Sequence, residues 1–478
     1  MSLQLLAVRL ELKSMFDLQR IAQIVDGSYS GRKVNCPLSG ISTDSRNLTP
    51  GELFVPLRGE RFDGHDYLSQ AVNNGAAACL SEEVIAGLSV PVVRVENTLQ
   101  ALGDIAAACR LQLSGPLVAI TGSAGKTTTK EMLAKILEQV APGLKTAGNF
   151  NNLIGLPLTL FRLEEQHQWA VLEMGTSALG EIKRLTEIAQ PTIGIITNIG
   201  AAHLETLRGL DGVARAKGEL YAGLQGGTAI LNLDDSRVSQ LPVANGVKKL
   251  TYGLSEQAQV RAEAIEDKEK GVSFDLLIAG QRYPVQLSLP GRHNVSNALA
   301  AAAAAMEMQV PAEKIVSGLS RFVAIQGRMD LYPLPCGGLL LDDSYNSNPL
   351  SAAAALDALV SLSGQGRRVA VLGDMLELGE AAVQMHEELG AQAADAVELL
   401  IGVGQYSAAL CRGAESAGMK PGQVIEVPDA AAAIKYLHGR QRSGDKILLK
   451  GSRGVHLELV ADALKTTVDT PLHGKKGD

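Results

Sequence analysis

The sequence predicts an α/β protein of three domains, in which a central P-loop-type domain with a parallel sheet precedes a C-terminal doubly wound, Rossmann-like domain. Two observations predict this class. Short apolar runs with the length of buried strands alternate with helical stretches, first between residues 117 and 232 and again between residues 339 and 449. The chain also has 478 residues, which is more than one hydrophobic core usually holds.

The first predicted domain covers residues 1–114. Its apolar and helical stretches lie at residues 53–57, 90–95 and 99–111. Ser114-Gly115-Pro116 is interpreted as the linker to the next domain, because Gly and Pro interrupt regular structure. Residues 1–14 lack the apolar core and cleavage site of a signal peptide, so we interpret them as an extension before a helix that begins near Met15.

The second predicted domain covers residues 115–328, and the third covers residues 329–478. Strands of the second domain are predicted at residues 117–121, 170–174, 193–198 and 229–232. Strands of the third are predicted at residues 339–343, 368–372, 399–403 and 446–449. Polar residues follow these strands, at the position where open α/β sheets bind ligands. The Ala-rich run at residues 300–305 is predicted to be a buried helix, and the polar residues after Lys465 are expected to fray.

Composition and charge argue against several classes of function. A formal net charge of -7, without a concentrated basic face, disfavours a nucleic-acid partner. No apolar run reaches the roughly 18 residues of a membrane span, so none is predicted. The five cysteines are scattered and form no C-x-x-C pair, which indicates reduced thiols and a cytoplasmic location rather than a zinc site or a disulfide framework.

A glycine-rich loop is the strongest functional motif. Thr121-Gly122-Ser123-Ala124-Gly125-Lys126-Thr127-Thr128 follows the first strand of the second domain and precedes a predicted helix at residues 126–140. Its glycines let the backbone approach phosphate oxygens, Lys126 would reach the terminal phosphates of ATP, and the Thr127 hydroxyl suits Mg²⁺. Ile120 stands where the common pattern has an outer glycine, so a glycine-rich turn beside an unrelated lysine is the alternative.

Three further residues have both a functional and a structural interpretation. Glu173 lies near the end of a predicted strand, where a carboxylate facing a phosphate loop would bind a hard cation, although a surface glutamate can also end a strand. His203, taken alone, is more often structural than a metal ligand. Lys217, taken alone, is a solvated residue of a helix.

Two polar clusters follow later in the chain. Asn294 and Asn297 are one helical turn apart and share a face, so they would either read adenine or cap the Ala-rich helix, and the pattern favours capping. The stretch at residues 342–349 follows a buried strand. Its acidic and amide groups suit a ribose or an amine, but Asn-Pro pairs also form simple turns.

Together these segments resemble the Mur ligase family, from about Met15 to Leu459. The glycine-rich loop is similar to that family in lacking the outer glycine. Further motifs that carry the resemblance lie at residues 42–46, 62–66, 149–159, 342–349, 373–379 and 450–454. The Asp-Asn-Pro-Arg signature of the diaminopimelate-adding member is absent.

The resemblance implies an ATP-dependent ligase of peptidoglycan synthesis. In the implied reaction, ATP phosphorylates the terminal carboxylate of UDP-N-acetylmuramoyl-tripeptide, and the amine of D-alanyl-D-alanine attacks the acyl phosphate. Phosphate then leaves a tetrahedral intermediate to give the UDP-muramoyl-pentapeptide. Mg²⁺ is the implied cofactor, these two substrates are the implied partners, and we expect a monomer.

The resemblance also assigns roles to individual residues. It implies catalysis by Lys126, Glu173, His203 and Lys217, with Mg²⁺ bound by Thr127, Glu173 and His203. Lys217 matches a position that is carbamylated in related ligases, which would turn a cation into an anionic group. ATP would contact Gly122, Ser123, Ala124, Gly125, Lys126, Thr127 and Thr128, with Asn294 and Asn297 at the adenine, Arg328 at the γ-phosphate and Asp343 at the ribose. UDP would be held by Ser45, Arg46, Phe54, Arg58, Gly59, Phe62 and Asp63. The muramoyl peptide would pass Asn151, Asn152 and Thr176, and D-alanyl-D-alanine would bind near Asn346 and Asn348.

Three alternatives stay open at this point. A folylpolyglutamate synthetase-like ligase shares the chemistry but should lack the first domain, which is full-sized here. A P-loop kinase or nucleotide switch should have a shorter chain without large flanking domains. A non-enzymatic nucleotide-binding protein would have no need of Lys126, Glu173 and His203 together.

Overall fold

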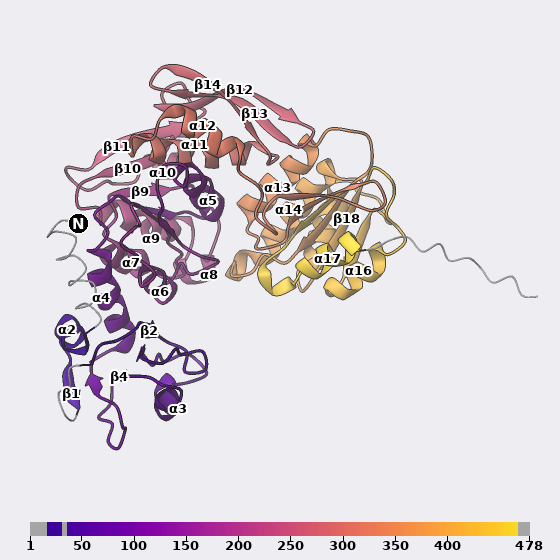
Figure 1. The fold of residues 1–478 in the computed structure, drawn as a ribbon. Coiled ribbons are helices and arrows are strands. Elements are labelled where there is room, and N and C mark those ends of the chain that lie inside the picture. Colours follow the sequence, from indigo (N-terminus) through magenta and orange to yellow (C-terminus); the bar gives the residue numbers. More distant parts are fainter. Residues whose placement is uncertain (1–16, 31–35, 467–478) are drawn as a thin grey trace, which may run out of the picture.

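The computed structural model describes residues 17–30 and 36–466 and builds them around three sheets (Figure 1). A small sheet lies at the lower left of the figure, a large central sheet lies above it, and a third sheet lies at the right. The predicted extension and the helix start near Met15 lie outside the described residues, as does nearly all of the tail that was expected to fray. The prediction of a three-domain α/β protein is confirmed, while the boundaries near residues 114 and 328 stay predictions.

The N-terminal sheet has the strand order β1-β5-β4-β3-β2. Its strands are β1 (Ser28–Ser30), β2 (Ile41–Ser42), β3 (Leu53–Phe54), β4 (Ala78–Ser81) and β5 (Val92–Arg94). Its helices are α2 (Leu18–Ile24), η1 (Gly64–Tyr67), α3 (Leu68–Asn73) and α4 (Thr98–Arg110). Strands β2 to β5 pair in parallel, and β1 pairs antiparallel to β5. The strands are shorter than predicted from the apolar runs at residues 53–57 and 90–95.

The central sheet has the strand order β14-β13-β12-β11-β10-β9-β6-β8-β7. Its strands are β6 (Leu117–Thr121), β7 (Leu144–Lys145), β8 (Ala170–Glu173), β9 (Ile193–Ile196), β10 (Thr228–Asn232), β11 (Lys248–Gly253), β12 (Val260–Lys268), β13 (Gly271–Ile278) and β14 (Gln281–Leu287). Pairing is parallel from β7 to β12 and antiparallel from β12 to β14. Since β6 lies between β8 and β9, its C-terminal end is the switch point at which open sheets of this type bind ligands.

Helices cover the central sheet and join it to its neighbours. They are α5 (Lys126–Leu137), α6 (Gly155–Leu160), α7 (Glu181–Ala189), α8 (Leu204–Leu207), α9 (Leu210–Ala222), α10 (Ser236–Ser239), α11 (Arg292–Glu307) and α12 (Ala312–Ser320). In α11 every residue from Ala298 to Ala305 is fully buried, which confirms the buried helix predicted there. The small side chains let α11 pack directly on α5, the helix that follows the glycine-rich loop. α4 of the first domain packs on α6 and α7, so this helix connects the N-terminal and central domains.

The C-terminal sheet has the strand order β15-β16-β20-β17-β18-β19, with parallel pairing throughout except between β15 and β16. Its strands are β15 (Asp330–Pro333), β16 (Leu339–Asp343), β17 (Arg368–Gly373), β18 (Leu399–Val403), β19 (Val424–Val427) and β20 (Lys446–Lys450). Its helices are α13 (Pro349–Ser361), η2 (Gly379–Ala381), α14 (Ala382–Ala396), α15 (Ser407–Ser416), α16 (Ala430–Leu437), η3 (Arg453–Val455) and α17 (Glu458–Thr466).

The side chains of β17 show that the third sheet is covered on both faces, as the doubly wound prediction requires. Ala370 and Leu372 pack with α13 and α14, whereas Val369 and Val371 pack with α16 and α17. Within the described ranges, no helix is both long enough and apolar enough to span a bilayer.

Candidate active site

The glycine-rich loop joins β6 to α5, and its two glycines stand where no other residue fits. Gly122 has φ of 152°, and a Cβ there would lie 1.8 Å from the Thr197 hydroxyl oxygen. Gly125 has φ of 81°, and a Cβ there would lie 2.3 Å from Oδ1 of Asn297. Both clashes involve groups packed beneath the loop, so larger residues would displace it.

Asn198, just after β9, braces the loop from the neighbouring strand. Its Oδ1 accepts a hydrogen bond from the Ala124 amide at 2.8 Å, and its carbonyl accepts one from the Ser123 amide at 3.1 Å. The Ser123 hydroxyl in turn donates to the carbonyl of Gly200 at 2.9 Å. The sequence did not predict a role for Asn198, although its position after a strand adjacent to β6 was a usable signal.

Lys126 lies at the mouth of the loop and is half-buried. Its Nζ donates to the Gly122 carbonyl at 2.7 Å, which folds the side chain back over the loop. Burial lowers the pKa of Lys126, the Glu173 carboxylate acts against that shift, and the Arg328 guanidinium adds to it. The ammonium therefore faces both a carboxylate and a second cation at one site.

Glu173, at the end of β8, is 3% exposed and has both carboxylate oxygens engaged. The Thr127 hydroxyl donates to Oε2 at 2.8 Å, and the Asn151 side-chain amide donates to Oε1 at 2.8 Å. Thr127 and Glu173, two of the three predicted Mg²⁺ ligands, are therefore in direct contact. The part of the chain that the structure describes holds no cluster of three or more His, Cys, Asp or Glu side chains that could bind a metal alone. This donor set fits a Mg²⁺ ion that takes its other ligands from phosphate oxygens and water.

His203 lies in a short connection between β9 and α8 and lines the same cleft as Lys126 and Glu173. It has a left-handed backbone with φ of 54°, and its Nδ1 is in ion-pair contact with Glu377 of the C-terminal domain. The sequence predicted a site role for His203 but gave no indication of Glu377 as its partner.

Lys217 is carried by α9 and is only 2% exposed, so the interpretation as a solvated helix residue is wrong. Burial, and then the nearby Lys126 ammonium, lowers the pKa of Lys217 well below its ordinary value. Its ammonium has no carboxylate partner among residues 17–30 and 36–466. An unpaired buried lysine of this kind is favoured in its neutral form.

One cleft of about 1020 Å³ between the central and C-terminal domains collects most of the predicted residues. Those that line it are Ser123, Ala124, Gly125, Lys126, Thr127, Thr128, Asn151, Asn152, Glu173, Thr176, His203, Lys217, Asn294, Asn297, Arg328, Asp343, Asn346 and Asn348. Gly122 does not line it, and neither does any of the seven residues predicted to hold UDP, which lie in the N-terminal domain.

The C-terminal wall of this cleft carries cations near Arg328, and the sequence did not single out two of them, Lys450 and Arg453. Lys450 Nζ pairs with Asp343 Oδ2 at 2.8 Å and donates to the Asn346 carbonyl. The guanidinium of Arg328 stacks on the Tyr345 ring at 4.1 Å from its centroid, and that of Arg453 lies 5.5 Å from the same centroid. Lys450 and Arg453 both belong to the motif at residues 450–454.

Asn294 and Asn297 do not cap the Ala-rich helix, so the favoured interpretation from the pattern is wrong. α11 begins at Arg292, before either residue, and its N-cap is Gly291. The Asn294 side-chain amide donates to the Pro290 carbonyl at 2.8 Å, and that of Asn297 donates to Asn294 Oδ1 at 3.1 Å. Both asparagines are buried beside the loop and line the cleft.

Several residues predicted to bind the substrates already make hydrogen bonds within the protein. Asn348 caps α13 through the Ser351 amide at 2.9 Å, and its own amide donates to the Ser123 carbonyl at 3.1 Å across the cleft. Asn152 Oδ1 accepts from the Gly155 amide at 2.8 Å at the start of α6. The Thr176 hydroxyl donates to the Ala178 carbonyl at 2.7 Å.

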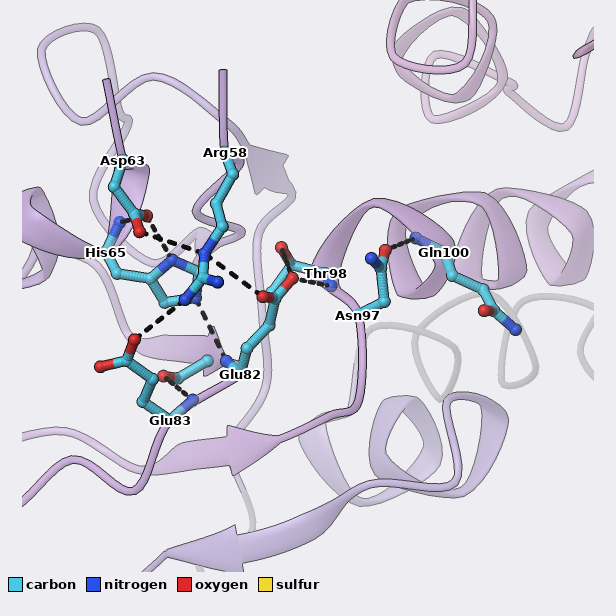
Figure 2. Close-up of polar contacts among 9 residues, drawn as sticks. Arg58, Asp63, His65, Glu82, Glu83, Asn97, Thr98 and Gln100 are labelled. Carbon is cyan, nitrogen blue, oxygen red and sulfur yellow. Dashed lines mark hydrogen bonds and ion pairs between the residues drawn. The ribbon is translucent and has the colours of Figure 1, made fainter. Parts of the chain in front are cut away.

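Figure 2 shows that Arg58 is already surrounded by carboxylates. Its Nη2 lies 2.9 Å from Glu83, and its Nε lies 3.1 Å from Asp63 and 3.4 Å from Glu82. His65 completes the group, since its Nδ1 contacts Asp63 at 2.6 Å and its Nε2 accepts from the Glu82 amide at 3.2 Å. The group has an excess of negative charge, so Arg58 is better placed to organise this loop than to pair with a diphosphate.

Glu82 ties this group to the helix that joins the domains. Its Oε1 accepts from the Thr98 amide at 2.9 Å and from the Thr98 hydroxyl at 3.1 Å, at the start of α4 (Figure 2). Asn97 caps the same helix through the Gln100 amide at 2.8 Å. The loop around Arg58 is therefore linked to α4, which packs on the central domain.

The other predicted UDP residues differ in how accessible they are. The Arg46 side chain is 77% exposed and pairs with Asp44 at 2.9 Å, and the side-chain and backbone hydrogen bonds of Arg46 lower the pKa of Asp44 to about 2. Phe62 is 60% exposed at a tight turn in which the Gly59 amide donates to the Phe62 carbonyl at 2.9 Å. Ser45 is buried at 7% exposure. Phe54 is 1% exposed within the core, so it can offer a ligand only its backbone.

Arg58→Ala is expected to lower stability more than Arg46→Ala, whereas Arg46→Ala is expected to lower affinity for UDP more than Arg58→Ala. Without Arg58, the three carboxylates lose the cation that they share, so the free energy of unfolding should fall by about 1 kcal/mol. The pair of Arg46 is exposed to solvent and should contribute little to the free energy of unfolding. Affinity for UDP should fall more in Arg46→Ala. Thermal unfolding and calorimetric titration with UDP test this, and an equal loss of affinity in both variants would contradict it.

Comparison with known proteins gives three matching family models. They are described as Mur ligase family, catalytic domain (residues 37–110), Mur ligase middle domain (residues 120–305) and Mur ligase, glutamate ligase domain (residues 327–453). The chain is similar to the UDP-N-acetylmuramoyl-tripeptide–D-alanyl-D-alanine ligase of Escherichia coli strain K12. The two are 38% identical over 453 residues, which cover 94% of this chain and 98% of the relative.

Solved structures resemble the whole chain as well. The crystal structure of MurF from Acinetobacter baumannii matches with a TM-score of 0.86 and 34% identity, covering 94% of this chain and 98% of that one. The MurF ligase of Thermotoga maritima in complex with ADP matches with a TM-score of 0.80 and 28% identity, covering 89% of this chain and 97% of that one.

Proposed function

Because the chain belongs to the Mur ligase family, we propose that it joins D-alanyl-D-alanine to UDP-N-acetylmuramoyl-tripeptide through an acyl phosphate formed from ATP. The observation that carries the proposal is the interdomain cleft. One wall holds the glycine-rich loop with Glu173 and Lys217, and the other holds Asp343 and Asn346. The first wall would hold the phosphates of ATP and the muramoyl-peptide carboxylate, and the second would hold the attacking amine, which is the arrangement that a carboxylate–amine ligase needs.

Transfer of the γ-phosphoryl group to a carboxylate brings two anions together. At about 4 Å their repulsion is roughly 4 kcal/mol at an effective dielectric constant of about 20. Lys126, held over the loop by the Gly122 carbonyl, is the cation placed to offset it, with Arg328 stacked on Tyr345 as the second. Mg²⁺ bound by Thr127, Glu173 and His203 would supply further positive charge at the phosphate oxygens.

D-alanyl-D-alanine needs a partner for its carboxylate while its amine stays free to attack. Arg453 is exposed, lines the cleft, and has no carboxylate partner in the part of the chain that the structure describes. We assign the dipeptide carboxylate to Arg453, beside Asn346. Asn348 contributes less directly, because its side chain already bridges α13 and the Ser123 carbonyl. Arg46 and Phe62 are the accessible groups for the UDP end of the other substrate.

We propose further that Lys217 is carbamylated, in addition to the use of ATP and Mg²⁺. A neutral amine can attack CO₂, form a new N–C bond and release one proton, which leaves an anionic carbamate in the cleft. The burial of Lys217 and its lack of a carboxylate partner support this. We also propose a cytoplasmic location and a monomer, as the sequence predicts.

Lys217→Ala is expected to lower the rate of ligation by about 10²-fold, the size of effect seen when one preorganised charge is removed. A short carboxylic acid such as acetate should restore part of the rate, because it can occupy the space of the carbamate. Lys249→Ala, which removes an exposed lysine outside the cleft, is the control. Unchanged rates in Lys217→Ala, or no gain of one CO₂ in the intact mass under bicarbonate, would contradict the carbamate.

A coupled assay of phosphate release tests the proposed function. Release should require UDP-N-acetylmuramoyl-tripeptide and D-alanyl-D-alanine together, with little release when either is left out. Glutamate with a folate is the comparison pair for the alternative ligase. Equal rates with that pair would overturn the assignment, and release from ATP alone at the full rate would point to a simple nucleotide hydrolase.

A further inference from the structure

The loop at residues 373–379 reaches from the C-terminal domain to the central domain beside His203. Glu377 Oε2 is in ion-pair contact with Nδ1 of His203. The carbonyl of Glu377 also accepts a hydrogen bond from the Glu205 amide at 3.3 Å. A Cβ added at Gly379 would lie 3.4 Å from the Cα of Glu205, so the two backbones run close together. The contact therefore involves side chains and main chain from both domains.

Both residues of the ion pair have an uncommon backbone conformation. His203 has φ of 54° and Glu377 has φ of 63°. This left-handed region costs any residue other than glycine about 1–3 kcal/mol relative to ordinary backbone geometry. Two such residues meet here from different domains. Since each conformation sets the direction of its side chain, the surrounding fold holds the imidazole and the carboxylate toward each other.

The C-terminal domain holds the loop that carries Glu377 firmly on its own side. Asp374 accepts from the amides of Gln405 and Tyr406, each at 2.8 Å. The Met375 amide donates to His386 Nε2 at 2.9 Å, and the Leu376 amide donates to the Ser452 hydroxyl at 3.0 Å. The segment that carries Glu377 is thus fixed to the C-terminal domain, so Glu377 moves with that domain.

We propose that Glu377 is a positioning residue, which the C-terminal domain supplies to His203 of the central domain. The carboxylate lies against Nδ1 of the imidazole and is the acceptor for a proton on that nitrogen, which leaves Nε2 as the nitrogen that can bind a metal in the cleft. Histidines that bind metals generally donate their other ring N–H in this way, which fixes the tautomer and the ring orientation. Because the acceptor comes from another domain, His203 is oriented only when the two domains are together.

This inference rests on the proposed function, since the role of His203 toward Mg²⁺ belongs to it. The test is Mn²⁺ affinity, measured by electron paramagnetic resonance on the full chain with ADP bound. Glu377→Ala should weaken Mn²⁺ binding about 10–100-fold. Glu377→Gln keeps an oxygen acceptor for Nδ1 and should weaken it by less than about 10-fold. Glu380→Gln, a neighbouring carboxylate that is exposed and has no ion-pair partner within the described ranges, should bind Mn²⁺ as the parent does.

Two results would overturn the inference. One is Mn²⁺ affinity in Glu377→Ala within about twofold of the parent, and the other is an equal loss in Glu377→Ala and Glu380→Gln. The Glu377 side chain is 59% exposed, so the variants should fold, and an unchanged melting temperature verifies it. Phosphate release by the parent tests the proposed function separately. If the parent needs both substrates but Glu377→Ala binds Mn²⁺ normally, only the role of Glu377 is wrong.

Discussion

Replacement of Lys126 by alanine is expected to lower phosphate release by about 10²–10³-fold at saturating substrates. Lys126 is the ammonium group folded over the glycine-rich loop, and it faces the Glu173 carboxylate within the cleft. Its loss leaves the charge that develops on the transferring phosphoryl group without its main fixed cation. Affinity for the UDP-linked substrate should stay within about twofold, because the UDP residues lie in the N-terminal domain.

The matched control for this variant is Lys135→Ala. Lys135 is carried by the same helix, α5, but its side chain is 44% exposed and makes a loose contact with Glu138 at 3.9 Å. Its replacement should leave phosphate release unchanged. A steady-state assay with separate titrations of ATP and the UDP substrate distinguishes the two variants. Parent-like turnover in Lys126→Ala would show that the cleft is not the site of phosphoryl transfer.

Glu173→Gln is expected to lower phosphate release by a similar factor, about 10²–10³-fold, and to raise the Mg²⁺ concentration needed for half-maximal rate. The glutamine has nearly the same shape, so one oxygen can still accept from Thr127 or Asn151. What disappears is the negative charge that a hard cation prefers. The variant therefore separates the charge of Glu173 from its hydrogen bonds.

Glu187→Gln gives the comparison for this charge change. Glu187 lies on α7, is half-exposed, and pairs at 3.7 Å with Arg184 outside the cleft. Its rate and its Mg²⁺ dependence should match those of the parent. If Glu173→Gln needed no more Mg²⁺ than the parent, the assignment of Glu173 as a metal ligand would be wrong, whatever happened to the rate.

The sequence predicted the parallel strands well because these strands are buried on both faces. β6, β16 and β18 coincide with the predicted runs: β6 and β18 each have a single residue that is not apolar, and β16 begins with three leucines. β13 was missed, although Val272, Phe274 and Leu276 alternate as they do in a half-buried strand. Alternation over a few residues is a weaker pattern than a continuous apolar run, and polar residues between them obscured it.

The candidate site was predictable where its chemistry is local in the chain. Glycine, lysine and threonine of the loop occur together, so their contacts follow from a single turn. Glu377 and Arg453 were not predicted as site residues, because they reach the cleft only when a second domain folds against the first. The carboxylates around Arg58 were missed for the same reason, since Glu82 and Glu83 arrive from another strand. Burial of Phe54 and the capping role of Asn348 likewise depend on tertiary packing.

The two outer strands of the central sheet have a consequence for association between copies of the chain. A free strand edge offers unpaired N–H and C=O groups that can recruit another strand. β14 carries Pro284, which has no N–H to donate, and its Gln281 and Arg282 are exposed. At the opposite edge, β7 has only two residues. Its Lys145 pairs with Glu131 of α5 and with Glu138, the C-cap of the same helix. Neither border can therefore be extended readily, and a long sheet that folds slowly is protected from edge-to-edge aggregation.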